Sequence, residues 1–391
     1  MRRAYGFIVL SAAGVACFSV VDVVYFQTLG YSLAFIGLMA AAFNLAVTAT
    51  ELPFAILFDR YSNKLALQVG NLARIGAFAL FFWSVDPQML LLAQVIAGIA
   101  VAAASGTSNA LVINQVSASV DDTGATRAFG RITYLVAGAS LVGGIVGICL
   151  YTLIPRTIWL AAIGFYLAAA VIILGFDDTR AAVEKIPWRT YSNRAFSVVR
   201  MRSTVVLILV NASAVAPFLI WQIKFNQVSV SFILLGFLLM NGARLIAPLV
   251  LQRVPVKTRS IGLAASCNAL AAGLFAVSSD SVSLAMTFAL HVLLHTVLIV
   301  LASGQFHSLV TNEIRATASS IVSLLDSLVV ALVAPLIGWI GQSAGLTPAV
   351  GMSCILYVAI AVLARRKRST QVTATAPEPQ QAPNLGTEPH A

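Results

Sequence analysis

The chain has 391 residues, of which 59% are hydrophobic and only 10% are charged, and this composition excludes an ordinary soluble domain. Its formal net charge of +10 does not indicate nucleic-acid binding, because the basic residues are concentrated in the segments between long apolar runs. Such uninterrupted runs predict membrane-spanning helices and exclude a β-barrel, since a helix satisfies its backbone polar groups within one segment.

Twelve segments are apolar and long enough to cross a bilayer, which takes about 20 residues. They predict an all-α membrane protein with twelve transmembrane helices. The predicted spans are residues 5–29, 33–57, 65–85, 88–117, 129–153, 157–176, 203–225, 229–251, 259–279, 281–310, 316–341 and 346–364.

The first span carries Asp22 in its outer half, followed by Tyr25. A lone carboxylate at this depth can meet a cationic or amine-bearing substrate, or take up a proton from outside; alternatively, it reaches the outer interface and faces a loop. Arg2 and Arg3 precede the span as they would in a signal peptide. The run is long and has no clear small-residue cleavage site, so we expect it to remain as the first helix.

The second span carries Glu51 and is followed by Asp59 and Arg60, charges expected to stay in water where the helix leaves the membrane. At 1.5 Å per residue, Glu51 lies about 12 Å inward from Asp59, and Arg74 lies about 15 Å inward from Lys64. The similar depths predict a possible Glu51–Arg74 ion pair, which would lower the cost of both charges in lipid. Such a pair either fixes helix packing or breaks when Glu51 takes up a proton.

A polar interval separates six spans from the other six. We therefore predict an N-terminal half (1–176), a cytoplasmic central loop (177–202), a C-terminal half (203–364) and a basic, then disordered, cytoplasmic tail (365–391). Shifting the second half by about 193 positions aligns 252–257 with 59–64 and Arg244 with Glu51, as expected for two pseudo-symmetric halves.

In the second half, Arg244 and Asp326 lie about 13 Å and 16 Å from the basic residues Arg253 and Arg315, so both are expected near the middle of the membrane and able to pair. A carboxyl group that lacks a nearby cation is costly to ionise in lipid. Asp326 and Glu51 are therefore candidates for proton exchange.

His291 and His295 are four residues apart and share a helix face. Zinc would require further ligands that the sequence does not offer, so we expect neither a metal nor another cofactor. The two imidazoles either line a cavity or bond to neighbouring helices. The cysteines have no metal-type spacing and are interpreted as small apolar fillers: Cys17, Cys149, Cys267 and Cys354.

Basic residues are strongly asymmetric between the two sets of loops. One set contains Arg2, Arg3, Arg60, Lys64, Arg127, Arg131, Arg253, Lys257, Arg259, Arg315, the basic residues of 177–202 and the run Arg365–Arg368. The opposite set contains only Arg156 and Lys224. The positive-inside rule therefore places both termini and the central loop in the cytoplasm.

The segment Ala55–Lys64 resembles the Gly-x-x-x-Asp-Arg-x-Gly-Arg-Arg signature of the major facilitator superfamily; Asp59, Arg60 and Lys64 match, and both glycines and one arginine are replaced. Residues 51–53, 105–107 and 312–319 are similar to segments of bacterial drug and metabolite efflux members. The fifth span lacks the proline of the antiporter signature, and its Gly143-x-x-x-Gly147 predicts close helix packing.

The resemblance implies two six-helix halves, with the first, fourth, seventh and tenth helices lining a central cavity. Trp221 is equally consistent with a belt residue at the membrane interface. The implied substrate-binding set is Asp22, Tyr25, Asn109, Asn114, Asn211, Trp221, Gln222, His291 and His295. The proposed proton-coupling or gating set is Glu51, Asp59, Arg60, Arg74, Arg244 and Asp326.

The sequence has no Walker-type phosphate loop and no nucleophile motif, so an ATP-driven pump and an enzyme are disfavoured. We expect a monomeric, proton-coupled secondary carrier of the bacterial inner membrane that exports a drug-like or secondary-metabolite small molecule by alternating access. One alternative is proton-coupled uptake of a sugar, peptide or organic acid. Another is a non-transporting receptor or assembly factor, which the charges within the spans argue against.

Overall fold

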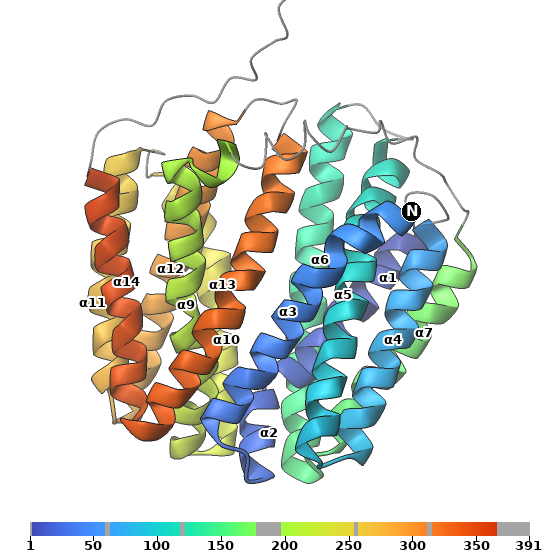
Figure 1. The fold of residues 1–391 in the computed structure, drawn as a ribbon, viewed down its shortest axis with the longest axis horizontal. Coiled ribbons are helices and arrows are strands. Elements are labelled where there is room, and N and C mark those ends of the chain that lie inside the picture. Colours follow the sequence, from blue (N-terminus) through green and yellow to red (C-terminus); the bar gives the residue numbers. More distant parts are fainter. Residues whose placement is uncertain are drawn as a thin grey trace, which may run out of the picture.

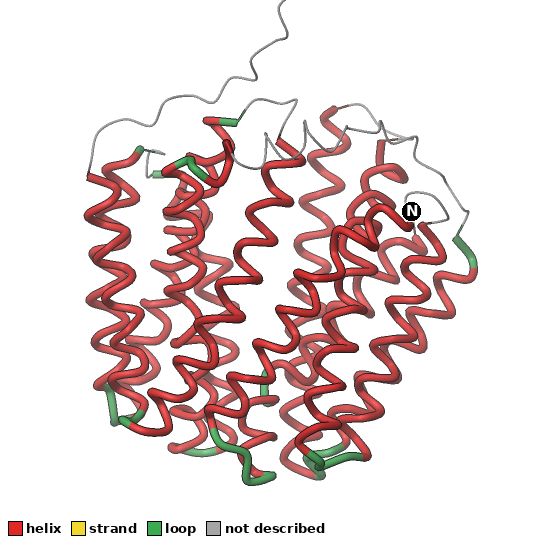
Figure 2. Tube along the Cα trace, viewed as in Figure 1, coloured by secondary structure: helices red, strands yellow, loops and turns green. Residues whose placement is uncertain are grey.

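The computed structural model describes residues 2–58, 63–117, 122–176, 197–253, 257–310 and 315–365. Within these ranges it is helical throughout, without strands (Figures 1 and 2). The helices are α1 (Arg2–Ser19), α2 (Asp22–Thr28), α3 (Leu33–Phe58), α4 (Asn63–Trp83), α5 (Pro87–Ser117), α6 (Asp122–Leu153), α7 (Thr157–Leu174), α9 (Arg202–Val228), α10 (Val230–Leu251), α11 (Thr258–Val277), α12 (Ser281–Leu309), α13 (Arg315–Ser343) and α14 (Leu346–Arg365).

Twelve helical segments of the described chain are long and apolar enough to cross a membrane, with α1 and α2 together forming the first. Large apolar side chains cover the outside of the bundle, among them Leu153 (77% exposed) and Leu332 (67% exposed). Apolar side chains are stable in such positions when lipid surrounds them. The predicted fold class is confirmed: this is an all-α, multi-pass membrane protein.

The predicted and observed spans differ most at α6, which begins at Asp122, whereas the apolar pattern placed its start at 129. Hydropathy marks only the part of a helix that suits lipid, and the intrahelical hydrogen bonds continue beyond it. The other correction concerns the first span. It is broken at Val20 and Val21, where a single helix was predicted.

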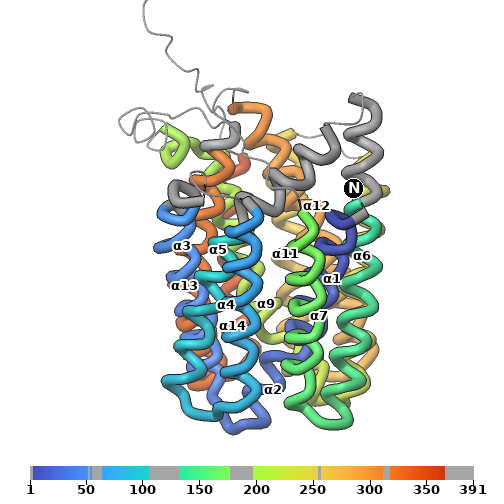
Figure 3. Tube along the Cα trace, turned by 90° about the vertical axis from the view of Figure 1, so that its right-hand side faces the viewer, coloured from blue at the N-terminus to red at the C-terminus, as the bar shows by residue number. Residues whose placement is uncertain are grey.

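The helices form two groups, α1–α7 and α9–α14, which lie side by side in Figure 1, and the view in Figure 3 is from the side of the first group. Most helices pack mainly within their own group, whereas α3 and α13 pack most extensively on each other. The two groups meet through α3 with α13, α6 with α10, and α2 with α9. We use "the α2 end" for the end of the bundle that contains α2 and the turns at residues 29–32, 84–86, 154–156, 278–280 and 344–345. The exact boundaries predicted for the two halves remain predictions, because 177–196 lie outside the described residues.

Close backbone contact joins the two groups at the α2 end. A Cβ added to Gly37 of α3 would lie 2.4 Å from the Ala334 carbonyl oxygen of α13, and one added to Gly338 would lie 2.4 Å from the Leu33 oxygen. Within the first group, a Cβ on Gly147 would lie 1.8 Å from the Cys17 oxygen, which confirms the close packing predicted for this glycine. Absence of a side chain lets the helix backbones touch.

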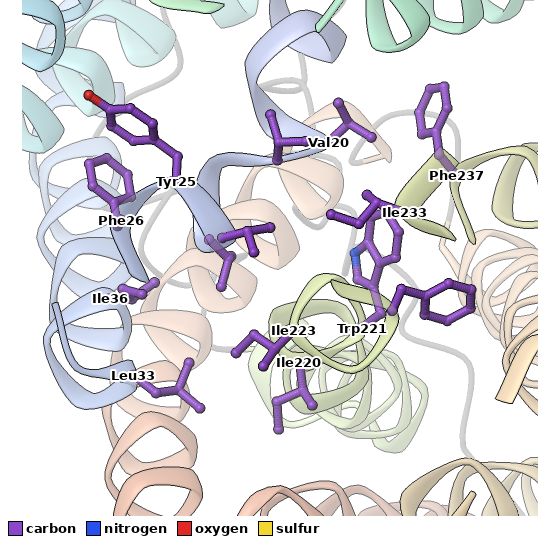
Figure 4. Packing of buried hydrophobic residues seen from close by; sticks show 14 of the residues in the cluster. Val20, Tyr25, Phe26, Leu33, Ile36, Ile220, Trp221, Ile223, Ile233 and Phe237 are labelled. Atoms are coloured by element: carbon purple, nitrogen blue, oxygen red, sulfur yellow. The ribbon is translucent and has the colours of Figure 1, made fainter. Parts of the chain in front are cut away.

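The largest buried apolar cluster also lies at the α2 end, and both groups contribute to it (Figure 4). Tyr25 and Phe26 come from α2, Ile220 and Trp221 from α9, and Phe237 from α10. A second cluster is confined to the α9–α14 group and its flanking residues. The two groups therefore share apolar packing at one end of the bundle.

Candidate functional site

A cavity of about 260 Å³ is lined mainly by residues of the first group, with Leu219 of α9 contributing from the second. Its aromatic lining is Phe18, Phe26, Phe43, Phe78, Phe81 and Trp159. Its polar lining is Asp22, Asn44 and Gln94. An apolar, aromatic wall with few polar anchors suits an amphipathic small molecule or one end of it.

Asp22 places a carboxylate in the wall of this cavity. Its Oδ1 accepts hydrogen bonds from the Val23 N–H (2.8 Å) and from Nε2 of Gln222 (3.0 Å). Among the described residues, no cationic side chain bonds to this carboxylate. Helices α2 and α9 thus bring together two members of the predicted substrate-binding set, Asp22 and Gln222.

Gln222 also explains the break in the first span. Its Oε1 accepts from the N–H groups of Val23 (3.1 Å) and Val24 (3.4 Å), and its Nε2 donates to the Ser19 carbonyl oxygen (2.9 Å). In a continuous helix the Val23 N–H would bond to the Ser19 oxygen four residues earlier. The side-chain amide is inserted between these two groups, a recognised cause of helix kinks.

Two other predicted substrate residues lie in the core instead of the cavity wall. Tyr25 is 1% exposed, and its hydroxyl donates to the Phe81 carbonyl oxygen (3.4 Å). Trp221 is stacked on Phe288, with ring centroids 5.5 Å apart. Each packs on aromatic rings of its own helix group, and both belong to the apolar cluster at the α2 end.

The Glu51–Arg74 ion pair considered from the sequence is not formed in this structure. Arg74 donates to the Tyr166 hydroxyl and lies 5.1 Å from the centre of the Tyr166 ring, while Oε2 of Glu51 is buried without a hydrogen-bond partner. Helix rise predicts depth but not direction around the helix axis. The helix of Glu51, α3, packs on α5 and α13, whereas α4 packs on α5 and α7.

Arg244 and Asp326 are also not paired. Oδ2 of Asp326 accepts from Nδ2 of Asn211 (2.6 Å), and its Oδ1 is buried without a partner. The Arg244 guanidinium lies 5.8 Å from the centre of the Phe218 ring. The reason is again topology, since α10 packs on α6, α9 and α12, whereas α13 packs on α3, α9 and α14. Asn211 is therefore the partner of Asp326.

The two histidines lie inside the second group, away from the aromatic cavity. Nδ1 of His291 is 3.0 Å from Oδ1 of Asn268, and Nδ1 of His295 is 3.1 Å from the Tyr357 hydroxyl. Nε2 of His291 and Nδ2 of Asn268 have no partners. No cluster of three or more histidine, cysteine or acidic side chains that could hold a metal is found in the described part of the chain.

Four predicted site residues lie where the structure does not describe their side chains. Asp59 and Arg60 lie outside the described residues, and Asn109 and Asn114 belong to α5 in a part whose side chains are not described. Lys224 donates to the carbonyl oxygens of Phe275 (2.7 Å) and Ala276 (2.8 Å) at the end of α11.

Sequence reasoning did not select four of the polar residues. Asn44 and Gln94 line the cavity, and Asn268 and Tyr357 bond to the histidines. All four are polar residues inside apolar spans, and that position was the available signal.

Comparison with known proteins gives matches at the level of family and fold. Residues 5–253 match the family model described as Major Facilitator Superfamily. No curated protein matches the chain in sequence.

Three similar solved structures indicate the range of relatives. The nucleoside transporter NupG is 14% identical, covers 94% of this chain and 100% of its own, and has a TM-score of 0.76. A POT family transporter in complex with a thioalcohol-conjugated peptide is 10% identical over 92% and 94% of the chains, with a TM-score of 0.74. A bacterial homolog of the human lysosomal transporter Spinster, in an inward-facing and occupied conformation, is 12% identical over 93% and 94%, with a TM-score of 0.71. At these identities the likeness shows the fold alone.

Proposed function

Because the chain belongs to the major facilitator superfamily, we propose that it is a proton-coupled secondary carrier that exports an amphipathic small molecule by alternating access. The observation that carries this proposal is the aromatic cavity with the Asp22 carboxylate in its wall. Carriers built from two six-helix repeats rock the repeats around a site near the middle of the membrane.

The lining of the cavity supports a cationic or amine-bearing substrate with an apolar body. Aromatic faces attract a positive charge within about 6 Å, and a carboxylate without a cationic protein partner adds a charged acceptor. Asp22 supplies that carboxylate, and the rings of Phe18, Phe26 and Trp159 are among the aromatic lining.

A second candidate is uptake of a small polar ring compound. The amide groups of Asn44 and Gln94 lie in the same aromatic wall, and amides and rings together can bind a heterocycle by hydrogen bonding and stacking. The similarity of fold to a nucleoside transporter agrees with this alternative without selecting it.

Two carboxyl groups support proton coupling. Oδ1 of Asp326 and Oε2 of Glu51 are buried acceptors without partners, and they belong to α13 and α3, the helices in close contact between the two groups. An ionised, unpaired carboxylate costs more to bury than a protonated one. Proton uptake at either residue would therefore bias the position of α3 against α13.

The conformation follows from the predicted orientation. If both termini are cytoplasmic, the α2 end faces outside, and the close contacts of Gly37 with Ala334 and of Gly338 with Leu33 lie at the outer end. The protein would then be in a state whose outer side is closed.

The test is substrate-induced proton movement in proteoliposomes, followed with a pH-sensitive dye, for cationic amphipathic compounds, nucleosides, sugars and short peptides. We expect cationic amphipathic compounds to drive proton movement in the wild type. We expect Asp326→Asn to abolish the signal and Asp86→Asn, in an exposed turn, to retain it. A signal with nucleosides, sugars or peptides alone would favour uptake. No signal with any compound would contradict proton-coupled transport.

A further inference from the structure

The junction between α1 and α2 depends on a side chain from the other helix group. Gln222 makes four hydrogen bonds there: it accepts from Val23 and Val24, and it donates to the Ser19 oxygen and to Oδ1 of Asp22. Gln222 is 3% exposed and Val24 is 1% exposed, so water does not compensate these groups.

The residues at the break do not themselves demand it. The sequence Ser19-Val20-Val21-Asp22 contains neither proline nor glycine, the residues that usually kink a helix. If Gln222 were absent and the break remained, the Val24 N–H and the Ser19 carbonyl would be buried without partners, each at a cost, and the Val23 N–H would keep only its bond to Oδ1 of Asp22. A continuous helix would remove that cost, because the Val23 N–H would bond to the Ser19 oxygen and the Val24 N–H to the Val20 oxygen. The break is therefore stable only with the amide inserted.

We propose that Gln222 is a positioning residue that links closure of the α2 end to the shape of the first span. When the helix groups meet at this end, the amide enters the span and breaks it. When they separate, the amide withdraws, the Val23 N–H bonds to the Ser19 oxygen and the span becomes continuous. This inference rests on the proposed alternating access, because it requires that the two groups separate at the α2 end.

The switch changes what Asp22 offers to the cavity. With the end closed, Gln222 occupies one lone pair of Oδ1, and the break at Val20 and Val21 separates α2 from α1. With the end open, the carboxylate loses that donor, and a substrate donor or water must replace it. The same movement separates α2 from α9, two helices that both contribute to the apolar cluster at this end (Figure 4). Closure of the α2 end and the ability of Asp22 to accept a hydrogen bond from a substrate therefore change together.

Spin-label distances across the α2 end test the proposal without any substrate. Labels are attached at Gln88 and Ser279, exposed positions in the first and second helix groups, in a full-length chain whose four native cysteines are replaced. Removing the inserted amide with Gln222→Leu should raise the ratio of open to closed molecules roughly tenfold, the effect of losing a net hydrogen bond or two. Gln227→Leu, an exposed position on the same helix, is the matched control and should leave the distances unchanged.

A second variant keeps the proposal testable if Gln222→Leu does not fold. In Gln222→Glu, a protonated carboxyl group can accept from Val23 and Val24 and donate one hydrogen bond, to the Ser19 oxygen, whereas an ionised one cannot donate. We expect this variant to be closed at low pH and to open as the pH rises. The neighbouring titratable groups are Asp22, in direct contact, and Lys224, which bonds to Phe275 and Ala276. The wild type contains both groups, so measuring it over the same pH range shows any change that their titration causes.

Unchanged distances in Gln222→Leu, an equal shift in Gln227→Leu, or a Gln222→Glu variant without pH dependence would each overturn the proposed link. The proteoliposome assay tests the carrier function independently of this link. Absence of transport together with a distance shift would contradict the carrier function and leave the link intact. Transport without a distance shift would support the carrier function and contradict the link.

Discussion

Arg74 illustrates how a charged side chain is accommodated within this bundle. It donates to the Tyr166 hydroxyl, and that hydroxyl in turn lies 3.4 Å from the Ser11 carbonyl oxygen. The guanidinium also lies over the Tyr166 ring. A neutral hydroxyl and an aromatic face therefore stabilise the cation, and they join α4, α7 and α1 in the core of the first group.

Removing the Tyr166 hydroxyl should destabilise the protein. We expect Tyr166→Phe to lower the free energy of unfolding in detergent by about 1–3 kcal/mol, because Arg74 loses its hydrogen-bond acceptor. The measurement is a denaturation curve, compared with Tyr134→Phe at an exposed position. In an Arg74→Met background Tyr166→Phe should cost much less; equal costs in both backgrounds would show that the two side chains are not coupled.

For single residues, the sequence indicated which side chains to select but not which side chains they contact. Asp22 and Asp326 were selected because charged side chains are costly within an apolar span, and Gln222 was selected through the family resemblance. The partner of Asp326 proved to be Asn211, and that of Arg74 proved to be Tyr166. Pairing depends on which faces of two helices meet, and neither depth nor charge determines this.

Helices α3 and α13 make close backbone contact between the two groups at the α2 end. Gly37 and Gly338 allow each backbone to approach a carbonyl oxygen of the other helix. The small-residue pattern at Gly143 and Gly147 was recognisable because both lie on one helix. Gly37 and Gly338 form no such pattern, because they lie on helices far apart in the sequence.

Adding one methyl group at Gly338 should disfavour the closed α2 end. In Gly338→Ala the new Cβ would lie 2.4 Å from the Leu33 oxygen, so α3 and α13 must move apart, at a cost of about 1–3 kcal/mol to the closed state. Spin labels at Gln88 and Ser279 should then report longer distances. The control is Gly164→Ala in α7, where an added Cβ meets nothing within 4 Å. A closed distance distribution in Gly338→Ala would mean that this contact does not limit closure.

The whole molecule joins two helix groups at one end, and each connecting helix carries a carboxyl group with one buried oxygen that has no hydrogen-bond partner. Glu51 lies on α3 and Asp326 on α13. A proton gained or lost at either changes the cost of burying that group, and the movement of one group against the other changes how deeply it is buried. Under the proposed alternating access, these two equilibria would be linked, as proton-coupled transport requires.

Replacing Glu51 with a group that does not titrate should weaken the pH dependence of transport. We expect Glu51→Gln to transport at a rate that varies less with pH than the wild-type rate, measured in proteoliposomes between about pH 5 and pH 8. The control is Asp280→Asn in an exposed turn. The N–H and hydroxyl of Ser283 bind the Asp280 carboxylate and hold its pKa below the ordinary value, so it stays ionised throughout this range. An unchanged profile in Glu51→Gln would assign Glu51 a packing role.

Hydropathy is a local property, so the sequence by itself determined which segments form the twelve spans and that the protein resides in a membrane. It also located the polar residues within those spans, since their cost in lipid depends on residue type and depth. The tertiary structure alone decided the hydrogen-bond partners, the aromatic cavity and the break in the first span. The break depends on an amide 199 residues away in the chain, and only the packing of α9 against α2 brings the two together.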